Sequence, residues 1–240
     1  MYANLASSVP DSTLAQWSAR TKVISLRSGG LRGRENALVQ SQKLFYTKTL
    51  ATPNGSYDEH VYAHTLGGRR KGDPHWGVNI CDPQGQWRTI HLQELKHGGY
   101  ALADGAFNDS GGDFSYTQGG KPYKPPAYTQ MIPITDWRLS IAKLLEYWQA
   151  NDGHAVHCVN GLNSSSVSVY PPMIGMMENA FGSSGMLLPS ATKWQSHARL
   201  ICDAQTRGWT PWVFCKMHSQ DANLWNRWRG YMPALAQTRA

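Results

Sequence analysis

The residues whose spacing could support metal-dependent nuclease chemistry are few in this chain of 240 residues. Asp82 and the later Glu94-Leu95-Lys96 have the letters of a nuclease core that places two carboxylates on one divalent ion. If residues 75–93 form a hairpin, however, Asp82 lies at its turn and Glu94 beyond its far strand, about 30 Å away. One ion cannot bridge that distance, so a nuclease is the weakest hypothesis.

Two pairs of histidines offer a second kind of site, because imidazole nitrogens are zinc ligands. His60 and His64 would share one face of a strand, and His154 and His157 form another close pair. A zinc site needs two further ligands, which no short spacing supplies here. Ordinary hydrogen-bonded or interface histidines are therefore the favoured interpretation, and no metal is predicted.

Motifs for nucleophilic and phosphate chemistry are absent from the sequence. It has no GxSxG elbow, no GxGxxG after a strand, no GxxxxGK followed by Ser or Thr, and no HExxH helix. Gly119-Gly120-Lys121 precedes a proline and lacks the earlier glycine of a phosphate loop. The sequence therefore predicts a protein that is not an enzyme and requires no cofactor.

The composition predicts a folded chain whose surface is poor in charge. Hydrophobic residues make up 41% and charged residues 16%, against roughly 25% charged in typical soluble domains. The 10 Trp, 11 Tyr and 5 Phe side chains have two open interpretations. They form a large aromatic core, or they contact a partner, since aromatic residues are enriched in interfaces.

The net charge of +7 could indicate a polyanion partner, but the cations are scattered along the chain. Arg69, Arg70 and Lys71 form the longest basic run, and the flanking glycines favour a solvated loop over a phosphate site. The four cysteines form no CxxC pair, and no run of about 18 apolar residues occurs. A reduced, cytosolic protein without a membrane partner is expected.

The chain divides into an N-terminal arm, residues 1–30, and a single compact domain, residues 31–240. A helix should begin at Pro10-Asp11-Ser12, with Leu14 and Trp17 on its apolar stripe. Ser28-Gly29-Gly30 is then interpreted as a hinge. Such an arm either folds back on its own domain or docks on a neighbouring molecule, and the sequence leaves both fates open.

The domain is predicted to be an α+β structure rich in strands. Alternating patterns predict strands over 43–50, 59–66, 75–82 and 86–93, the last two forming a hairpin at Asp82-Pro83-Gln84-Gly85. Residues 98–133 are interpreted as a long loop rich in Gly, Pro and Tyr. Further on, helices are expected over 135–153, 191–207 and 221–229, and short strands over 154–160, 165–170 and 210–217.

One stretch resembles the N-terminal part of cypovirus polyhedrins, the matrix proteins of viral occlusion bodies. The resemblance covers about 35 to 40 residues and rests on Arg32-Gly33-Arg34-Glu35 after two glycines, then Gln40-Ser41-Gln42 and the strand-like Val61-Tyr62-Ala63. The arm here is longer than the family's by nearly 20 residues, and past the middle of the chain nothing matches residue by residue.

The resemblance implies a compact β-sandwich core with flanking helices and a projecting N-terminal helical arm. It also implies trimers that crystallise in the cytoplasm of infected cells, embed virus particles and dissolve at alkaline pH as tyrosines ionise. Family members can hold a nucleotide such as ATP, GTP or CTP, for which Arg69, Arg70 and Lys71 are candidate contacts. A soluble module that binds nucleotides or nucleic acid is the alternative hypothesis.

Overall fold

Helices and strands alternate along the chain in the computed structural model, which describes residues 9–20, 23–26, 34–38, 40–48, 57–65, 68–69, 79–81, 85–97, 102–109, 111–112, 116, 132–154, 156–178, 180 and 190–214. The helices are α1 (Asp11–Ser18), α3 (Gln86–His97), α4 (Ile134–Asn151), α5 (Ser164–Val169) and α6 (Ala191–Thr206), with short 3-10 turns η1 (Glu35–Leu38) and η2 (Glu59–Val61). The strands are β1 (Val23–Leu26), β2 (Gln42–Lys48), β3 (His64–Thr65), β4 (Gly68–Arg69), β5 (Gly105–Asp109), β6 (Val156–Asn160), β7 (Ile174–Glu178) and β8 (Thr210–Phe214).

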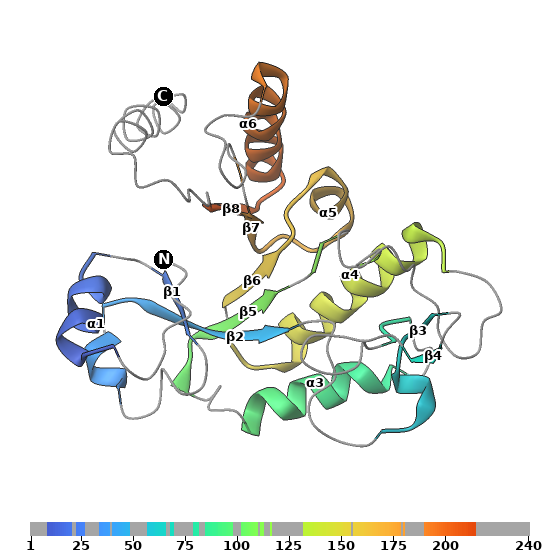
Figure 1. Cartoon of the computed structure of the whole chain (residues 1–240), viewed down its shortest axis with the longest axis horizontal. Helices are drawn as coiled ribbons and strands as arrows, with labels where there is room; N and C mark the ends of the chain where they lie inside the picture. Colours follow the sequence, from blue (N-terminus) through green and yellow to red (C-terminus); the bar gives the residue numbers. More distant parts are fainter. Residues whose placement is uncertain are drawn as a thin grey trace.

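Six strands form one curled sheet in the order β1-β2-β5-β6-β7-β8, and every neighbouring pair is parallel (Figure 1). Parallel neighbours need long connections that cross over the sheet, and these carry helices α3, α4, α5 and α6. Strands β3 and β4 form a separate antiparallel pair. The described residues therefore form a mixed α and β fold with a parallel sheet, and not the β-sandwich that the resemblance implied.

The two faces of the sheet are covered differently, because alternate residues of a strand point to opposite faces. On what we call the inner face, Leu44, Phe107, Cys158 and Met176 pack against one another. The other face contributes Val159 and Met177 to the main core beneath the helices. The helices thus cover one face at the centre of the sheet. On the inner face, the side chains of the curled strands pack against one another.

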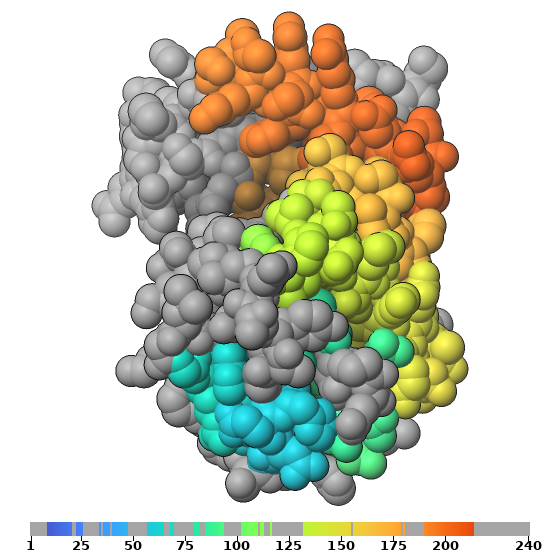
Figure 2. All heavy atoms as spheres, turned by 90° about the vertical axis from the view of Figure 1, so that its right-hand side faces the viewer, coloured from blue at the N-terminus to red at the C-terminus, as the bar shows by residue number. Residues whose placement is uncertain are grey.

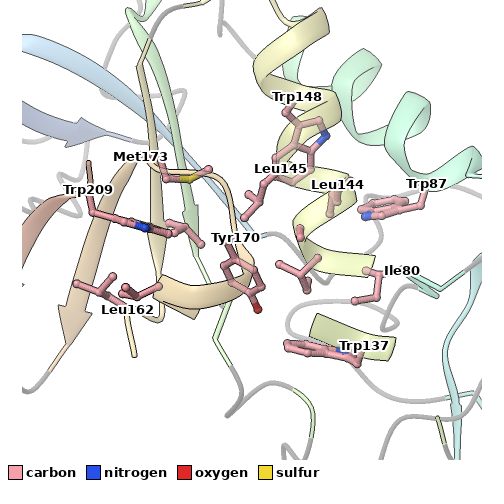
Figure 3. Close-up of a cluster of buried hydrophobic side chains, with 14 of the residues drawn as sticks. Ile80, Trp87, Trp137, Leu144, Leu145, Trp148, Leu162, Tyr170, Met173 and Trp209 are labelled. Atoms are coloured by element: carbon pink, nitrogen blue, oxygen red, sulfur yellow. The ribbon is translucent and has the colours of Figure 1, made fainter. Parts of the chain in front are cut away.

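Helix α4 supplies the centre of the main core (Figure 3). Its buried residues Trp137, Ile141, Leu144, Leu145 and Trp148 recur every three or four positions, as an apolar helical stripe must. Truncating one of these tryptophans to alanine would cost about 3 to 5 kcal/mol. Helix α4 lies between segment 57–65 at one end of the molecule and α6 at the other (Figure 2). It confirms the helix predicted over 135–153.

Helix α3 replaces the strand predicted over 86–93, and that prediction is wrong. Trp87 and His91 lie one helical turn apart, and the ring of His91 stacks on Trp148 of α4 with centroids 4.2 Å apart. Burial among these rings lowers the pKa of His91 to about 3. The separation of about 30 Å estimated for the nuclease carboxylates assumed an extended strand and does not apply to a helix.

Further segments differ from the sequence predictions, among them 59–66, where η2 takes the place of the first part of the predicted strand. Residues predicted as a strand over 165–170 form α5, because the Asn163 side chain accepts from the Ser166 backbone while the Ser166 hydroxyl accepts from the Asn163 backbone. This reciprocal cap starts a helix in spite of the β-branched residues that follow. Within the predicted loop 98–133, strand β5 is one of the two central strands of the six-stranded sheet. Parts of that loop and the helix predicted over 221–229 lie outside the described residues.

The N-terminal helix α1 packs on its own chain. Leu14 is fully buried against Ile24, Leu38 and Phe45, and Trp17 packs on the edge of the same cluster. Of the two fates that the sequence left open, the structure has the helix folded back. Residues 28–30, the predicted hinge, lie outside the described residues. None of the described helices has the length and apolar character needed to cross a membrane.

Candidate active site

Three polar residues end neighbouring strands at the carboxyl edge of the sheet. Asp109, Asn160 and Glu178 are the last residues of β5, β6 and β7. Each lies two positions beyond an inner-face residue, namely Phe107, Cys158 and Met176, and therefore continues that face. In parallel sheets this edge is where ligands bind, because the loops that follow the strands surround it.

The amide of Asn160 joins the two carboxylates. Its Nδ2 donates to Oδ1 of Asp109 at 2.7 Å and to Oε2 of Glu178 at 2.9 Å, so these oxygens are no more than about 5.6 Å apart. The two hydrogens of an amide nitrogen diverge by about 120°, which sets the oxygens roughly 5 Å apart. Asp109 is half-buried and Glu178 is exposed, so a ligand can reach both from solvent.

Tyr46 fixes the second oxygen of Asp109. Its hydroxyl donates to Oδ2 at 2.5 Å, and its ring stacks on Phe107 with centroids 5.8 Å apart. Because the ring packs against a buried neighbour, the hydroxyl has little freedom to leave the carboxylate. Asp109 thus accepts from at least two donors, Tyr46 on β2 and Asn160 on β6, which hold its plane in one orientation.

Aromatic and sulfur-containing side chains form the layer of the inner face directly before the carboxylates. Tyr46 and Phe107 are joined there by Trp212 of β8, which meets Phe107 edge-on with centroids 6.0 Å apart and is partly exposed. Cys158 and Met176 complete the layer. Burial, with the nearby charge of Asp109, raises the pKa of the Cys158 thiol well above its usual range. This thiol stays protonated and is no candidate nucleophile.

Glycines hold the ends of β5 and β6 together just beyond the site. Gly161 has a φ of 128°, and a Cβ there would lie 2.3 Å from the Cα of Gly112. The Gly111 backbone donates to the Asn160 carbonyl at 2.9 Å and its own carbonyl accepts from the buried Tyr170 hydroxyl at 3.0 Å. This close backbone contact needs glycine and sets the spacing of Asp109 and Asn160.

None of the motifs in the sequence indicates this site. Its residues come from strands far apart in the chain, so no local spacing connects them. The one available signal was that short apolar runs each end in a polar residue, as in Phe107-Asn108-Asp109, Val159-Asn160 and Met177-Glu178. Such a signal has meaning only once the strands are known to be parallel neighbours.

The residues of the predicted family motif lie elsewhere. Arg34 pairs with Asp11 of α1 at 2.7 Å and donates to the backbone carbonyl of Val9, and so ties η1 to the N-terminal helix. Glu35 begins η1, while Arg32 and Gly33 lie outside the described residues. Arg34 therefore links the motif to the N-terminal arm of the same chain.

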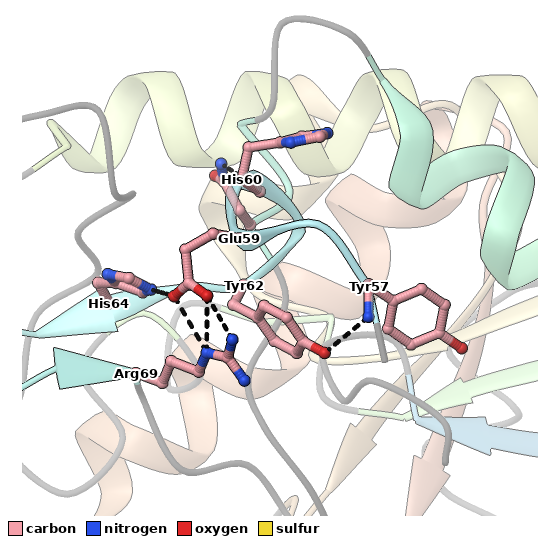
Figure 4. Close-up of polar contacts among 7 residues, drawn as sticks. Tyr57, Glu59, His60, Tyr62, His64 and Arg69 are labelled. Atoms are coloured by element: carbon pink, nitrogen blue, oxygen red, sulfur yellow. Dashed lines mark hydrogen bonds and ion pairs between the residues drawn. The ribbon is translucent and has the colours of Figure 1, made fainter. Parts of the chain in front are cut away.

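The predicted phosphate contact Arg69 is engaged by a neighbouring carboxylate (Figure 4). Its guanidinium donates to both oxygens of Glu59 and lies 4.0 Å from the centroid of the Tyr62 ring. His64 Nε2 lies 2.7 Å from the same carboxylate. We call Glu59, Tyr62, His64 and Arg69 the hairpin cluster. Arg70 and Lys71, the other two candidate contacts, lie outside the described residues.

The histidine pairs are not assembled into a metal centre by the described residues. Among these, no three His, Cys, Asp or Glu side chains gather closely enough to hold an ion. His157 Nε2 lies 2.9 Å from Asp152 at the end of α4, where both side chains are buried. Glu94 is on α3, and Asp82, the other carboxylate of the predicted nuclease pair, lies outside the described residues.

A polar cavity lies at the opposite, amino edge of the sheet. It has a volume of about 580 Å³, and its lining includes Lys43, Asp104 and His154. Two of these lining residues, Lys43 and Asp104, form an ion pair with Nζ and Oδ2 3.1 Å apart. Asp104 is the one carboxylate among the described residues that line this cavity, so we regard the carboxyl edge, with its two carboxylates, as the better candidate for catalysis.

Comparison with known proteins finds no family model that matches this chain and no curated protein similar to it.

Proposed function

We propose that this protein is a glycoside hydrolase whose catalytic pair is Asp109 and Glu178. The observation that carries the proposal is the shared amide of Asn160, which holds the two carboxylates side by side at the carboxyl edge of a curled parallel sheet. Glycoside hydrolysis generally needs two such groups, one to protonate the leaving oxygen and one to act on the anomeric carbon or on water. No motif is required, which agrees with the lack of sequence signatures.

The surroundings of the pair favour a sugar over other substrates. Tyr46 and Trp212 present aromatic rings next to the carboxylates, and aromatic rings offer an apolar surface to the C–H faces of a sugar. The two carboxylates disfavour a phosphate-bearing substrate, since like charges repel. We therefore expect a neutral or cationic glycoside.

A second use of paired carboxylates agrees less well with this geometry. In an aspartic protease the carboxylates share one proton at about 3 Å, which is shorter than the separation set here by the amide of Asn160.

The test uses the purified full-length chain and a panel of 4-nitrophenyl α- and β-glycosides of common hexoses, pentoses and N-acetylhexosamines. We expect nitrophenol release from at least one substrate, and a loss of about 10³-fold or more in Asp109→Asn and Glu178→Gln. Glu59→Gln is the matched control, because it removes an acid from the hairpin cluster, and it should retain activity. Equal residual activity in all three variants, or no release from any glycoside, would contradict the proposal.

Self-assembly into occlusion bodies is a second proposal, and its support comes from the Arg32-Gly33-Arg34-Glu35 resemblance and the low content of charge. The described part of the chain favours the interpretation that the aromatic residues form a large core. Four tryptophans are buried there, namely Trp87, Trp137, Trp148 and Trp209. Expression of the chain alone in insect cells tests it: dense particles that dissolve above about pH 10 would support assembly, and a dissolved monomer would exclude it.

A further inference from the structure

We infer that this site works by double displacement with retention of anomeric configuration, with Asp109 as the nucleophile and Glu178 as the acid and base. The inference rests on the proposed function and deepens it. Its first support is the separation of the two carboxylates. Retaining enzymes hold them about 5 to 5.5 Å apart, whereas inverting enzymes need roughly 6.5 to 9.5 Å to admit a water molecule. The shared amide of Asn160 keeps one oxygen of each carboxylate, Asp109 Oδ1 and Glu178 Oε2, within about 5.6 Å of the other.

The second support is the unequal setting of the two carboxylates. Asp109 is half-buried and is held by the Tyr46 hydroxyl and the Asn160 amide, at 2.5 and 2.7 Å. A nucleophile that must meet the anomeric carbon in line gains from such fixed orientation. Glu178 is exposed at the end of β7 and has a longer side chain. A group that gives its proton to the leaving oxygen and regains one from water must remain in contact with solvent.

The reaction then has two balanced steps. In the first, an oxygen of Asp109 attacks the anomeric carbon, the bond from that carbon to the leaving oxygen breaks, and the leaving oxygen takes the proton of Glu178. In the second, the Glu178 carboxylate takes a proton from water and the water oxygen attacks the anomeric carbon. The ester bond breaks and its electron pair returns to Asp109. Two inversions at one carbon give net retention.

Tyr46 and Asn160 are positioning residues in this scheme. They donate to Asp109 in the free protein, so the departing carboxylate of the second step returns to an environment that already holds its donors. Their contribution to the rate comes through the orientation of Asp109.

The first test follows the anomeric protons of the product by NMR during the first minutes of hydrolysis of the best aryl glycoside. We expect the product anomer to match the substrate. An inverted first product would overturn this inference while leaving the proposed function in place. Absence of hydrolysis of any glycoside would remove the proposed function and this inference with it.

The second test identifies the nucleophile. Incubation with 2,4-dinitrophenyl 2-deoxy-2-fluoro-glycosides should add one fluoroglycosyl group to the peptide that contains Asp109, as seen by mass spectrometry, with Glu59→Gln labelled equally. Azide should restore turnover to Asp109→Gly with an inverted glycosyl azide, and to Glu178→Gly with a retained one. A label on Glu178, or the opposite pairing of azide products, would overturn the assigned roles.

Discussion

The candidate active site and the hairpin cluster both centre on a carboxylate held by neighbouring donors, but they differ in what the donors are. Glu59 of the hairpin cluster meets a guanidinium and an imidazole, and donation from Arg69 lowers its pKa. Asp109 meets a phenol, and it shares with Glu178 the single amide of Asn160. In the hairpin cluster, the carboxylate of Glu59 forms an exposed ion pair with Arg69 of the two-stranded hairpin. In the candidate active site, a phenol and an amide among the described residues donate to Asp109, and the amide also holds Glu178 beside it, which is an arrangement suited to chemistry.

The largest difference between the two clusters is expected when a central donor is removed from each, Asn160 from the site and Arg69 from the hairpin cluster. Asn160→Leu keeps the volume and deletes the amide, so the two carboxylates lose the group that sets their separation. We expect activity on the best glycoside to fall by about 10² to 10³-fold. Arg69→Leu is the matched change, and it should leave kcat/KM within about twofold of the wild-type value. Equal losses in the two variants would abolish the distinction.

Glycines near each cluster allow a second matched pair, measured by urea unfolding. Gly161 and Gly68 both have positive φ, so alanine at either costs about 1 to 2 kcal/mol in strain. Only at Gly161 would the new Cβ also meet backbone, and there we expect a further loss of about 1 to 3 kcal/mol together with reduced activity. Gly68→Ala should leave activity unchanged. A Gly161→Ala protein as stable as Gly68→Ala would mean that the contact with Gly112 is not close.

Removing one tyrosine hydroxyl from each cluster is a third matched pair, and its expected effect is smaller. Tyr46→Phe removes the donor to Oδ2 of Asp109 and should lower kcat by about 10-fold, with little change in KM. Tyr62→Phe removes the hydroxyl that accepts from the Tyr57 backbone at 3.0 Å, which should reduce stability without affecting kcat. A Tyr46→Phe enzyme with an unchanged kcat would show that this hydroxyl does not position Asp109.

The smallest predicted effect is the pH dependence of the hairpin cluster. Because the folded-state pKa of Glu59 is below the unfolded value of 4.5, its charge stabilises the fold above that pH and this stabilisation is lost as the pH falls through the lowered pKa. Glu59→Gln should therefore be slightly less stable than wild type at pH 7, and the deficit should shrink in acid. Urea midpoints at pH 7 and pH 3 measure it. A deficit that grows in acid would contradict the assigned direction.

Elements with a strong local pattern could be predicted from the sequence. Helices α4 and α6 have clear apolar periodicity, and the Ser190 side chain caps α6 as expected. Strands β2, β6 and β8 also occur where predicted. The failures have physical causes: alternation around Trp87 and His91 resembles a strand, yet both side chains pack on α4, and β5 is a five-residue strand of mostly small residues inside a glycine-rich stretch.

The candidate site was beyond such reasoning, since it exists only through tertiary pairing. Asp109 and Glu178 are 69 positions apart and become neighbours of Asn160 because three strands align in parallel. Arg34, which carries part of the sequence resemblance, lies outside this site and holds the N-terminal helix in place. Polar residues at the ends of apolar strands are the feature that a sequence-based search for this kind of site should score.

The order of the strands has a consequence for how this chain is made. In the six-stranded sheet, the strands lie side by side in the order in which they occur along the chain. When a strand emerges from the ribosome, the neighbour on which it pairs has therefore already emerged. The sheet can then be extended one strand at a time as translation proceeds. On that schedule Asp109 and Asn160 meet first, and the second carboxylate arrives only when β7 is added.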